Sequence, residues 1–263
     1  MWKIGSLFSG VGGIELGFER TGGFETAWFV ECEPYAQAVL RKHWPNVPIY
    51  GDIREIDFTT LPKVDILTGG FPCQDISNAG KRKGITGERS GLWKEYLRAI
   101  CEIRPKIVFV ENVAALVNRG LDVVLRDLAQ AGYDAEWDCL SAADIGAPHK
   151  RQRFFLIAYP GSSLGNNRMD FNIKHEIQRN KEWSATQNIR QGNGWKRWLI
   201  QVNKDVGGKI SKSDFFGMDD GISEELDRIK CLGNSVVPQC SEVFAEIIKE
   251  KLERAENEKE KVK

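Results

Sequence analysis

The sequence lacks several features that would assign it to a specialised class of protein. Its 263 residues contain no apolar run that approaches the roughly 18 residues of a membrane-spanning helix. Its six cysteines lie far apart without a Cys-x-x-Cys pair, and there are three histidines. A disulfide framework, a metal site and a membrane location are therefore not expected, and a reducing cytoplasm is the natural compartment.

An excess of charge of one sign is also missing. Lys and Arg total 37, as do Asp and Glu, so any site for a polyanion must be a local patch. Apolar residues make up 41% of the chain and charged residues 28%, which excludes a disordered or collagen-like protein. This length and composition predict one large α/β domain, or one domain with a smaller insertion.

The first 160 residues alternate short apolar runs with helical patterns, which is typical of a doubly wound, parallel sheet. Strands are predicted at Lys3–Phe8, Thr26–Val30, Val47–Tyr50, Val64–Thr68, Lys106–Val110, Glu136–Ser141 and Phe154–Tyr159. Helices are predicted at Gly13–Thr21, Pro34–His43, Gly91–Ile103 and Leu121–Ala131. A last helix is expected to carry Val243, Phe244, Ile247, Ile248 and Leu252.

Chemically useful residues follow five of these strands. The first strand leads into the glycine turn Ser9–Gly13, the second into Glu31 and the third into Asp52. The fourth leads into Gly69–Gln74 and the fifth into Glu111. Because ligands of open α/β sheets bind beyond the carboxyl ends of the strands, these residues predict one shared crevice.

The glycine turn and the carboxylates favour a nucleoside cofactor in this crevice. A glycine turn lets a ligand approach the backbone and the N-terminus of the next helix. Glu31 can accept from both hydroxyls of a ribose, and Asp52 can accept from an adenine amino group. A dinucleotide fingerprint would need glycine where Glu15 stands, which disfavours NAD.

Cys73 is the candidate nucleophile. It follows Pro72 on a loop, whereas Cys32, Cys101, Cys139 and Cys240 are interpreted as small packing residues. Cations lower the pKa of a thiol and favour the nucleophilic thiolate, and four of them follow this loop: Lys81, Arg82, Lys83 and Arg89.

A thiolate beside the carboxyl group of Glu111 indicates conjugate addition to an electron-poor ring, with the acid serving the ring nitrogen. A Cys–His protease is the competing interpretation, but the three histidines give it little support. His149 lies in a basic run with Arg151 and Arg153, which reads either as an anion clamp or as surface charge.

The composition changes after Pro160. Residues 160–215 contain ten Lys and Arg against five Asp and Glu, with tryptophans among them. Lys196 and Arg197 stand between Trp195 and Trp198 and are candidates for contacts with a phosphate backbone. The three-residue spacing of the two tryptophans fits a packed helix face better than stacking on nucleic acid. We interpret this region as an inserted second domain.

The ordered motifs resemble the C5-cytosine DNA methyltransferase family, of prokaryotic or phage type. The matching motifs, in chain order, are Phe-Ser-Gly-x-Gly-Gly (Phe8–Gly13), the single residues Glu31 and Asp52, Gly-Gly-Phe-Pro-Cys-Gln (Gly69–Gln74), Glu-Asn-Val (Glu111–Val113), Arg-x-Arg (Arg151–Arg153) and Gly-Asn-Ser-Val-Val-Pro (Gly233–Pro238). The resemblance covers Lys3–Tyr159 and Ile229–Ile248. It implies the S-adenosylmethionine-dependent methyltransferase fold, a Rossmann-like mostly parallel sheet with a small inserted recognition domain.

The resemblance also implies roles for individual residues. Cys73 would attack C6 of a flipped cytosine, Glu111 would hold its N3 and amino group, and Arg151 and Arg153 would lie near the base and its phosphate. S-adenosylmethionine would supply the methyl group. Its pocket is expected from Phe8, Gly10, Gly12, Glu31, Cys32, Asp52, Ile53, Pro72, Leu92, Asn234 and Ser235. DNA contacts are expected from Gln74, Ser77, Lys81, Arg82, Lys83, Arg89, Lys196 and Arg197.

The implied organisation is a catalytic and cofactor-binding domain at 1–159, a target-recognition domain at 160–228 and a returning C-terminal segment at 229–263. The expected partner is double-stranded DNA, near the nucleoid in the cytoplasm. A monomer is expected, with a cognate restriction endonuclease acting separately. Cys32 stands where many members of the family have a larger side chain on the adenine, so weaker cofactor binding is expected.

The sequence leaves two alternatives open. One is the tRNA-cytosine branch of the same lineage, which carries a Cys-Phe-Thr triplet in its recognition region. This chain has no such triplet, and no cysteine between Cys139 and Cys231. The other is a DNA-binding relative without catalytic activity. Such proteins lose the nucleophile or the cofactor pocket, and this sequence keeps both.

Overall fold

A computed structural model describes residues 1–72, 91–145, 150–161, 171–179 and 236–261. These residues form a seven-stranded sheet in the order β3-β2-β1-β4-β5-β7-β6. The strands are β1 (Trp2–Leu7), β2 (Phe24–Val30), β3 (Ile49–Tyr50), β4 (Ile66–Gly69), β5 (Ile107–Val113), β6 (Tyr133–Ser141) and β7 (Gln152–Pro160). The predicted α/β class and the predicted strands are confirmed.

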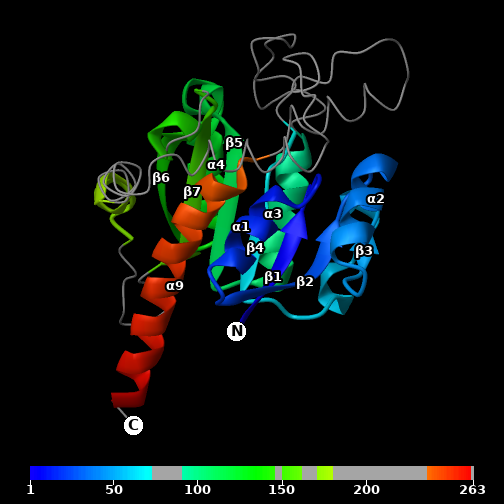
Figure 1. Cartoon of the computed structure of the whole chain (residues 1–263), viewed down its shortest axis with the longest axis horizontal. Helices are drawn as coiled ribbons and strands as arrows, with labels where there is room; N and C mark the ends of the chain where they lie inside the picture. The colour runs from blue at the N-terminus through cyan, green and yellow to red at the C-terminus, as the bar shows by residue number, and fades with distance from the viewer. Residues whose placement is uncertain (73–90, 146–149, 162–170, 180–235, 262–263) are drawn as a thin grey trace, which may run out of the picture.

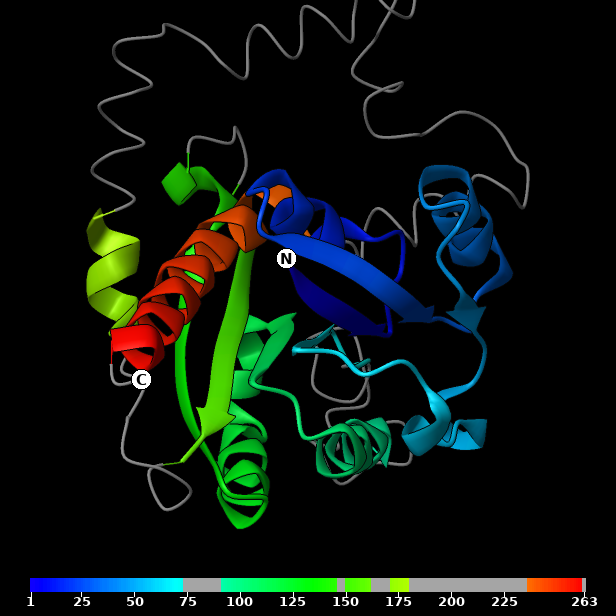
Figure 2. The same cartoon turned by 90° about the horizontal axis from the view of Figure 1, so that it is seen from below.

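Helices cover both faces of the sheet (Figures 1 and 2). Their bounds are α1 (Gly13–Arg20), α2 (Pro34–His43), α3 (Leu92–Ile103), α4 (Leu121–Gln130) and α9 (Pro238–Lys261). Successive residues of β5 face opposite sides of the sheet. Phe109 packs with α1 and α9 in one buried cluster, and Val110 packs with α3 and α4 in the other. The doubly wound arrangement follows from this alternation.

The sheet is parallel except around β7. This strand pairs antiparallel with both β5 and β6, and Glu111 lies opposite Phe155 in the register. β3 is shorter than predicted because Pro48 has no backbone N–H to donate, although its carbonyl still accepts from the N–H of Phe29. β6 begins at Tyr133, three residues before the predicted start at Glu136.

Helix α9 returns to the sheet beside α1. A Cβ at Gly17 would lie 2.4 Å from the carbonyl oxygen of Pro238, and one at Gly13 would lie 2.8 Å from that of Val236. Glycine at these positions therefore lets the start of α9 lie directly on the first turns of α1. Lys249 adds a hydrogen bond of 2.6 Å from Nζ to the carbonyl of Thr21. This packing brings residue 236 next to the glycine turn.

Residues 171–179 also pack against this core. Glu136 on β6 accepts from the N–H of Phe171 at 2.7 Å and from that of Ile173 at 3.2 Å. Phe171, Ile173 and Ile177 are buried in the same cluster as Phe109. This part of the predicted recognition segment is thus fixed to the sheet, while the predicted domain boundaries stay predictions.

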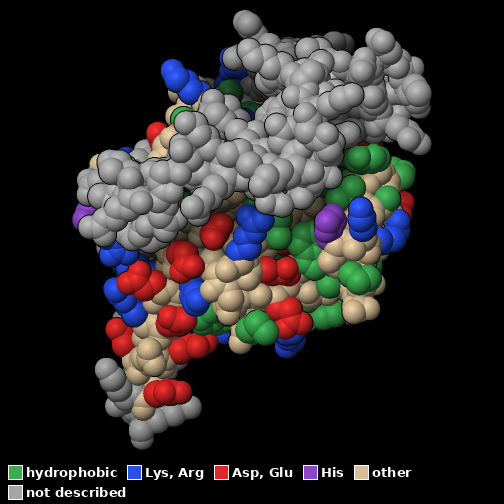
Figure 3. All heavy atoms as spheres, viewed as in Figure 1, with side chains coloured by type: hydrophobic (Ala, Val, Ile, Leu, Met, Phe, Trp, Pro, Cys, Tyr) green, Lys and Arg blue, Asp and Glu red, His purple; other side chains and the backbone are tan. Residues whose placement is uncertain are grey.

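Charges of both signs are interspersed on the described part of the face shown in Figure 3. This distribution agrees with the zero net charge of the sequence. Within the described ranges, no helix combines the length and the apolar character needed to cross a membrane.

Candidate active site

A cavity of about 410 Å³ opens at the carboxyl ends of β1, β2, β4 and β5. Parallel strands end at the same edge of the sheet, so the segments that follow them meet there. The lining includes eight of the residues predicted for the cofactor: Phe8, Gly10, Glu31, Cys32, Asp52, Ile53, Pro72 and Leu92. It also includes Glu111 and Arg153, so the two predicted functions share one cavity.

The glycine turn after β1 forms one wall. Gly10 has φ 55° and Gly12 has φ 80°, which is the left-handed region that favours glycine. A Cβ at Gly10 would meet nothing within 4 Å, so the backbone there faces open space. Gly12 is absent from the cavity lining. Its Cβ would lie 2.6 Å from the ring of Trp44, so packing and backbone conformation explain this glycine.

Glu31 is held by two backbone donors. Its Oε2 accepts from the N–H of Gly10 at 2.7 Å, and its Oε1 accepts from the N–H of Glu33 at 2.8 Å. The residue is 8% exposed and lines the cavity. Each carboxylate oxygen has a further lone pair, so the group can still accept from two hydroxyls of a ligand.

Asp52 carries a partner that the sequence analysis did not single out. Arg54 Nε lies 2.9 Å from its Oδ1, and Nη2 of the same guanidinium donates to Oδ2. These hydrogen bonds from Arg54 lower the pKa of Asp52 to about 2. Arg54 lines the cavity beside Asp52. The predicted contact of Asp52 with an adenine amino group therefore concerns a carboxylate that is already ion-paired.

Glu111 lies at the other end of the cavity, on β5. Its side chain is buried, and Arg153 of the neighbouring strand β7 places Nε 3.1 Å from Oε1. The antiparallel register explains this pair, because Val113 lies opposite Arg153, two residues beyond Glu111. Arg151 is half-buried and is absent from the cavity lining, but its charge acts on Glu111.

Burial dominates the electrostatics of Glu111. Desolvation raises the pKa of its carboxyl group to about 7, although Arg153 and Arg151 oppose the shift. The group can therefore hold a proton near neutral pH and donate it to a ligand. Such strongly perturbed acids cluster at functional sites.

Two neighbours fix the surroundings of Glu111. Asn112 donates from Nδ2 to the carbonyl of Phe71 at 3.2 Å, which ties β5 to the segment that leads to Pro72. A Cβ at Gly70 would lie 2.9 Å from Oε2 of Glu111, so this position needs glycine for the carboxyl group to keep its place. Gly70 and Pro72 both line the cavity.

Several predicted residues lie outside the described part of the chain. Cys73 is the first of them, immediately after Pro72, and the others are Gln74, Ser77, Lys81, Arg82, Lys83, Arg89, His149, Lys196, Arg197, Asn234 and Ser235. Of the Gly-Asn-Ser-Val-Val-Pro motif, Val236 is described and lines the cavity.

Sequence reasoning missed lining residues such as Tyr35 and Arg54. Ser9 and Phe71 also line the cavity, and both stand in segments that the sequence placed in the predicted crevice, Ser9–Gly13 and Gly69–Gln74. No pattern in the sequence marks Arg54 or Tyr35, because their positions depend on the turns that follow β2 and β3.

The chain is a doubly wound α/β protein with a cavity at the carboxyl ends of its parallel strands and a buried acid, Glu111, in the lining of that cavity. A family model for C-5 cytosine-specific DNA methylases matches residues 2–209. The chain belongs to this family.

Individual relatives agree with the family model. The chain is 41% identical over 60% of its length to the type II methyltransferase M.Bsp6I of Bacillus sp. (strain RFL6), covering 52% of that protein. It is 42% identical over 59% of its length to M2.BsuMI of Bacillus subtilis (strain 168), covering 41% of it. The chain thus spans about half the length of the curated relatives that it matches.

Solved structures show the same fold. One is described as a DNA modification methyltransferase encoded within a prophage of E. coli. It matches with a TM-score of 0.52 and 27% identity, covering 65% of this chain and 49% of the other.

Proposed function

We propose that the chain is a DNA (cytosine-5-)-methyltransferase that uses S-adenosylmethionine. The observation that carries the proposal is the buried carboxyl group of Glu111, which lines the same cavity as Gly10 and Glu31 and lies beside the segment that leads into Cys73. Family membership and the names of the type II methyltransferase relatives support it.

The residues around the cavity fit S-adenosylmethionine. Gly10 leaves open space where a side chain would stand, and Glu31 is fixed with lone pairs available for a ribose diol. Phe8, Ile53 and Leu92 supply apolar surface for an adenine ring. When bound, this cofactor supplies an electrophilic methyl group.

Glu111 would act on the cytosine ring. A protonated carboxyl group can donate to N3, and its carbonyl oxygen can accept from the exocyclic amino group. The pKa of about 7 keeps a large fraction of Glu111 protonated near neutral pH. Arg153, held 3.1 Å from the same carboxyl group, would fix its orientation and face the base.

Cys73 would supply the covalent step. Its thiolate adds to C6, the C5–C6 double bond opens, and the displaced electron pair reaches C5 while N3 receives a hydrogen bond or proton from Glu111. C5 would then bond to the methyl group, and the sulfonium of S-adenosylmethionine would be left as the neutral thioether S-adenosylhomocysteine. Loss of the C5 proton to a base would re-form the double bond and expel the thiolate, while N3 returns its proton to Glu111, so no net oxidation occurs.

Basic residues of the chain would bind the DNA. The basic residues between Cys73 and Arg89, with Lys196 and Arg197, would contact the phosphate backbone, and residues 160–228 would recognise the target sequence. Extruding the cytosine costs a few kcal/mol, which contacts of the base edge with Glu111 and Arg153 would offset. We further propose a cytoplasmic monomer that acts at the nucleoid, paired with a separate restriction endonuclease.

Bisulfite sequencing of DNA from cells that express the chain tests this proposal. We expect methylated cytosines within one short sequence context, and none with Cys73→Ser. Cys101→Ser is the matched control, because Cys101 is an exposed cysteine on α3 outside the cavity and should leave the methylation unchanged.

Methyl incorporation into purified duplex DNA and into transfer RNA separates the alternatives. Incorporation into transfer RNA alone would support the RNA branch. DNA binding without incorporation into either substrate would support a relative that has no catalytic activity.

A further inference from the structure

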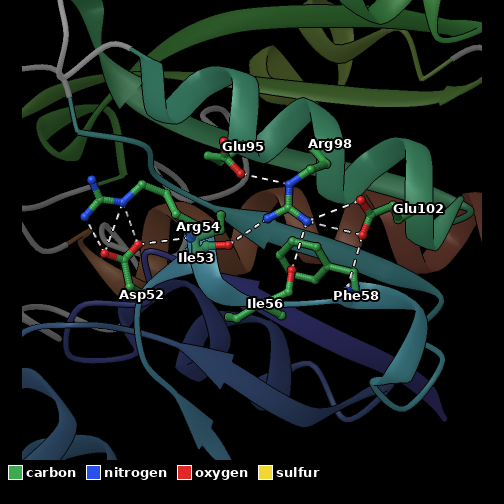
Figure 4. Close-up of polar contacts among 8 residues, drawn as sticks. All are labelled: Asp52, Ile53, Arg54, Ile56, Phe58, Glu95, Arg98 and Glu102. Atoms are coloured by element: carbon green, nitrogen blue, oxygen red, sulfur yellow. Dashed lines mark hydrogen bonds and ion pairs between the residues drawn. The ribbon is translucent and has the colours of Figure 1, made fainter.

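Arg98 lies outside the cavity but binds the segment that forms one of its walls. It stands on α3, on the helix whose first residue, Leu92, lines the cavity. Its guanidinium donates to the carbonyl of Ile53 at 2.8 Å and to that of Ile56 at 2.9 Å (Figure 4). One side chain therefore connects a helix to the backbone of the turn that follows Asp52.

The guanidinium is itself fixed from several sides. Its Nε lies 2.8 Å from Oε2 of Glu95, and Nη1 lies 3.2 Å from Oε1 of Glu102 (Figure 4). The ring of Phe58 lies under it, with Cζ 5.0 Å from the ring centroid. Glu102 also accepts from the backbone N–H of Phe58 at 3.3 Å. A planar group held this way presents its donors in a fixed geometry.

The segment that Arg98 contacts has little regular structure of its own. It consists of the two short 3-10 turns η1 (Ile53–Glu55) and η2 (Phe58–Thr60), which follow the two-residue strand β3. Backbone contacts fix its start, where Tyr50 accepts from the N–H of Glu31, and the indole of Trp28 binds the carbonyl of Pro62 beyond its end. Between these two points, the hydrogen bonds from Arg98 connect the segment to helix α3.

We propose that Arg98 is a positioning residue for the cofactor, because it sets the distance between Ile53 on the turn and Leu92 on α3. Both of these side chains line the cavity and are proposed to contact the adenine, while Arg98 does not line it. The inference rests on the proposed use of S-adenosylmethionine. The proposal is that Arg98 raises the affinity of the pocket for the cofactor without contacting the cofactor itself.

Two substitutions at Arg98 and one control test the proposal. Arg98→Met keeps an unbranched stem over Phe58 and removes every donor, whereas Arg98→Lys keeps a charge and can reach one carbonyl. Arg104→Met is the matched control, since Arg104 follows the same helix, donates to the carbonyl of Ala131 at 2.6 Å and lies over the ring of Tyr133. It makes the same kinds of contact away from the cavity.

Equilibrium dialysis with S-adenosylmethionine, without DNA, gives the first readout. We expect the Kd to rise about tenfold in Arg98→Met, to recover partly in Arg98→Lys and to stay within twofold in Arg104→Met. At saturating cofactor, the methyl-transfer rate of Arg98→Met should stay within about threefold of the wild type. An unchanged Kd in Arg98→Met, or an equal rise in Arg104→Met, would overturn the proposal.

Hydrogen exchange of the ligand-free protein gives a second readout that does not depend on the cofactor. In Arg98→Met, exchange should increase at residues 53–61 and stay unchanged in β1 and β5. Uniformly faster exchange would mean that Arg98 serves general stability, which contradicts the positioning role. If the wild type fails to bind S-adenosylmethionine, the proposed function fails, and the exchange pattern alone still decides whether Arg98 holds this wall.

Discussion

The titration of Glu111 is the residue-scale property that links the stability of the protein to its chemistry. Burial raises its pKa from 4.5 to about 7, so the folded protein retains a proton that the unfolded chain releases. A raised carboxyl pKa stabilises the folded state fully below the unfolded value, and this contribution is lost as the pH rises through the folded value.

We therefore expect the unfolding free energy of the wild type to fall relative to Glu111→Gln between about pH 4 and about pH 8. A pKa difference of this size corresponds to at most about 3 kcal/mol. Urea denaturation of both proteins at several pH values measures it. A difference between the two proteins that is constant across this pH range would contradict the raised pKa.

Gly70 offers a test of the position of the same carboxyl group. In Gly70→Ala, the new Cβ would lie 2.9 Å from Oε2 of Glu111 and would displace a group that Arg153 holds. The single-turnover rate of methyl transfer should fall by about a hundredfold, because small misplacements of a reacting group are costly.

Gly161→Ala is the control for this substitution, because its Cβ would make only ordinary contacts, at 3.5 Å or more. Its rate should match that of the wild type. If Gly70→Ala also kept the wild-type rate, the close approach of Gly70 to Glu111 would have no bearing on catalysis.

At the scale of elements, the contact between α1 and α9 depends on glycine. Gly17→Ala would place a Cβ 2.4 Å from the backbone carbonyl of Pro238, which cannot move without shifting α9. We expect a loss of about 2 kcal/mol in the free energy of unfolding, since overpacking exceeds the gain in helix propensity.

Chemical denaturation checks this value, with Gly91→Ala as the control, because a Cβ at Gly91 would meet nothing within 4 Å. Stability equal to that of the wild type in Gly17→Ala would show that the two helices are not packed as closely as described.

The sequence predicted the elements better than their pairing. The alternation of β5 residues such as Phe109 and Val110 marks a strand that is buried on both faces, and Pro34 marks the start of α2. The direction of β7 could not be predicted, because an apolar run such as Phe154–Tyr159 reads the same in either orientation. The ion pair of Glu111 with Arg153 depends on that direction.

In the candidate site, too, the sequence predicted some residues and could not predict others. Motifs located Phe8, Glu31 and Glu111, because Phe8 ends a predicted strand and the other two directly follow one, at the edge where parallel strands end. Arg98 could not be found in this way. Its partners, the carbonyls of Ile53 and Ile56, are backbone atoms brought near it only by tertiary packing.

At the scale of the whole molecule, the described residues bring the segments proposed to bind the cofactor and the buried acid Glu111 into one cavity at the edge of the sheet. The two buried clusters on the faces of the sheet both include residues of β1, β2, β4, β5, β6 and β7, so the geometry of the cavity depends on the entire described core. The proposed mechanism forms one covalent bond at this cavity, between the sulfur of Cys73 and C6 of a cytosine.

Trapping that bond is the most direct measurement. A duplex library of random sequence in which 5-fluorocytosine replaces every cytosine is incubated with the protein and S-adenosylmethionine. Fluorine at C5 is not lost as a proton is, so the thiolate cannot leave. We predict a protein–DNA adduct that survives denaturation and maps to the peptide containing Cys73 by mass spectrometry. Methylation of ordinary cytosine without any such adduct, or an adduct at another residue, would contradict the account.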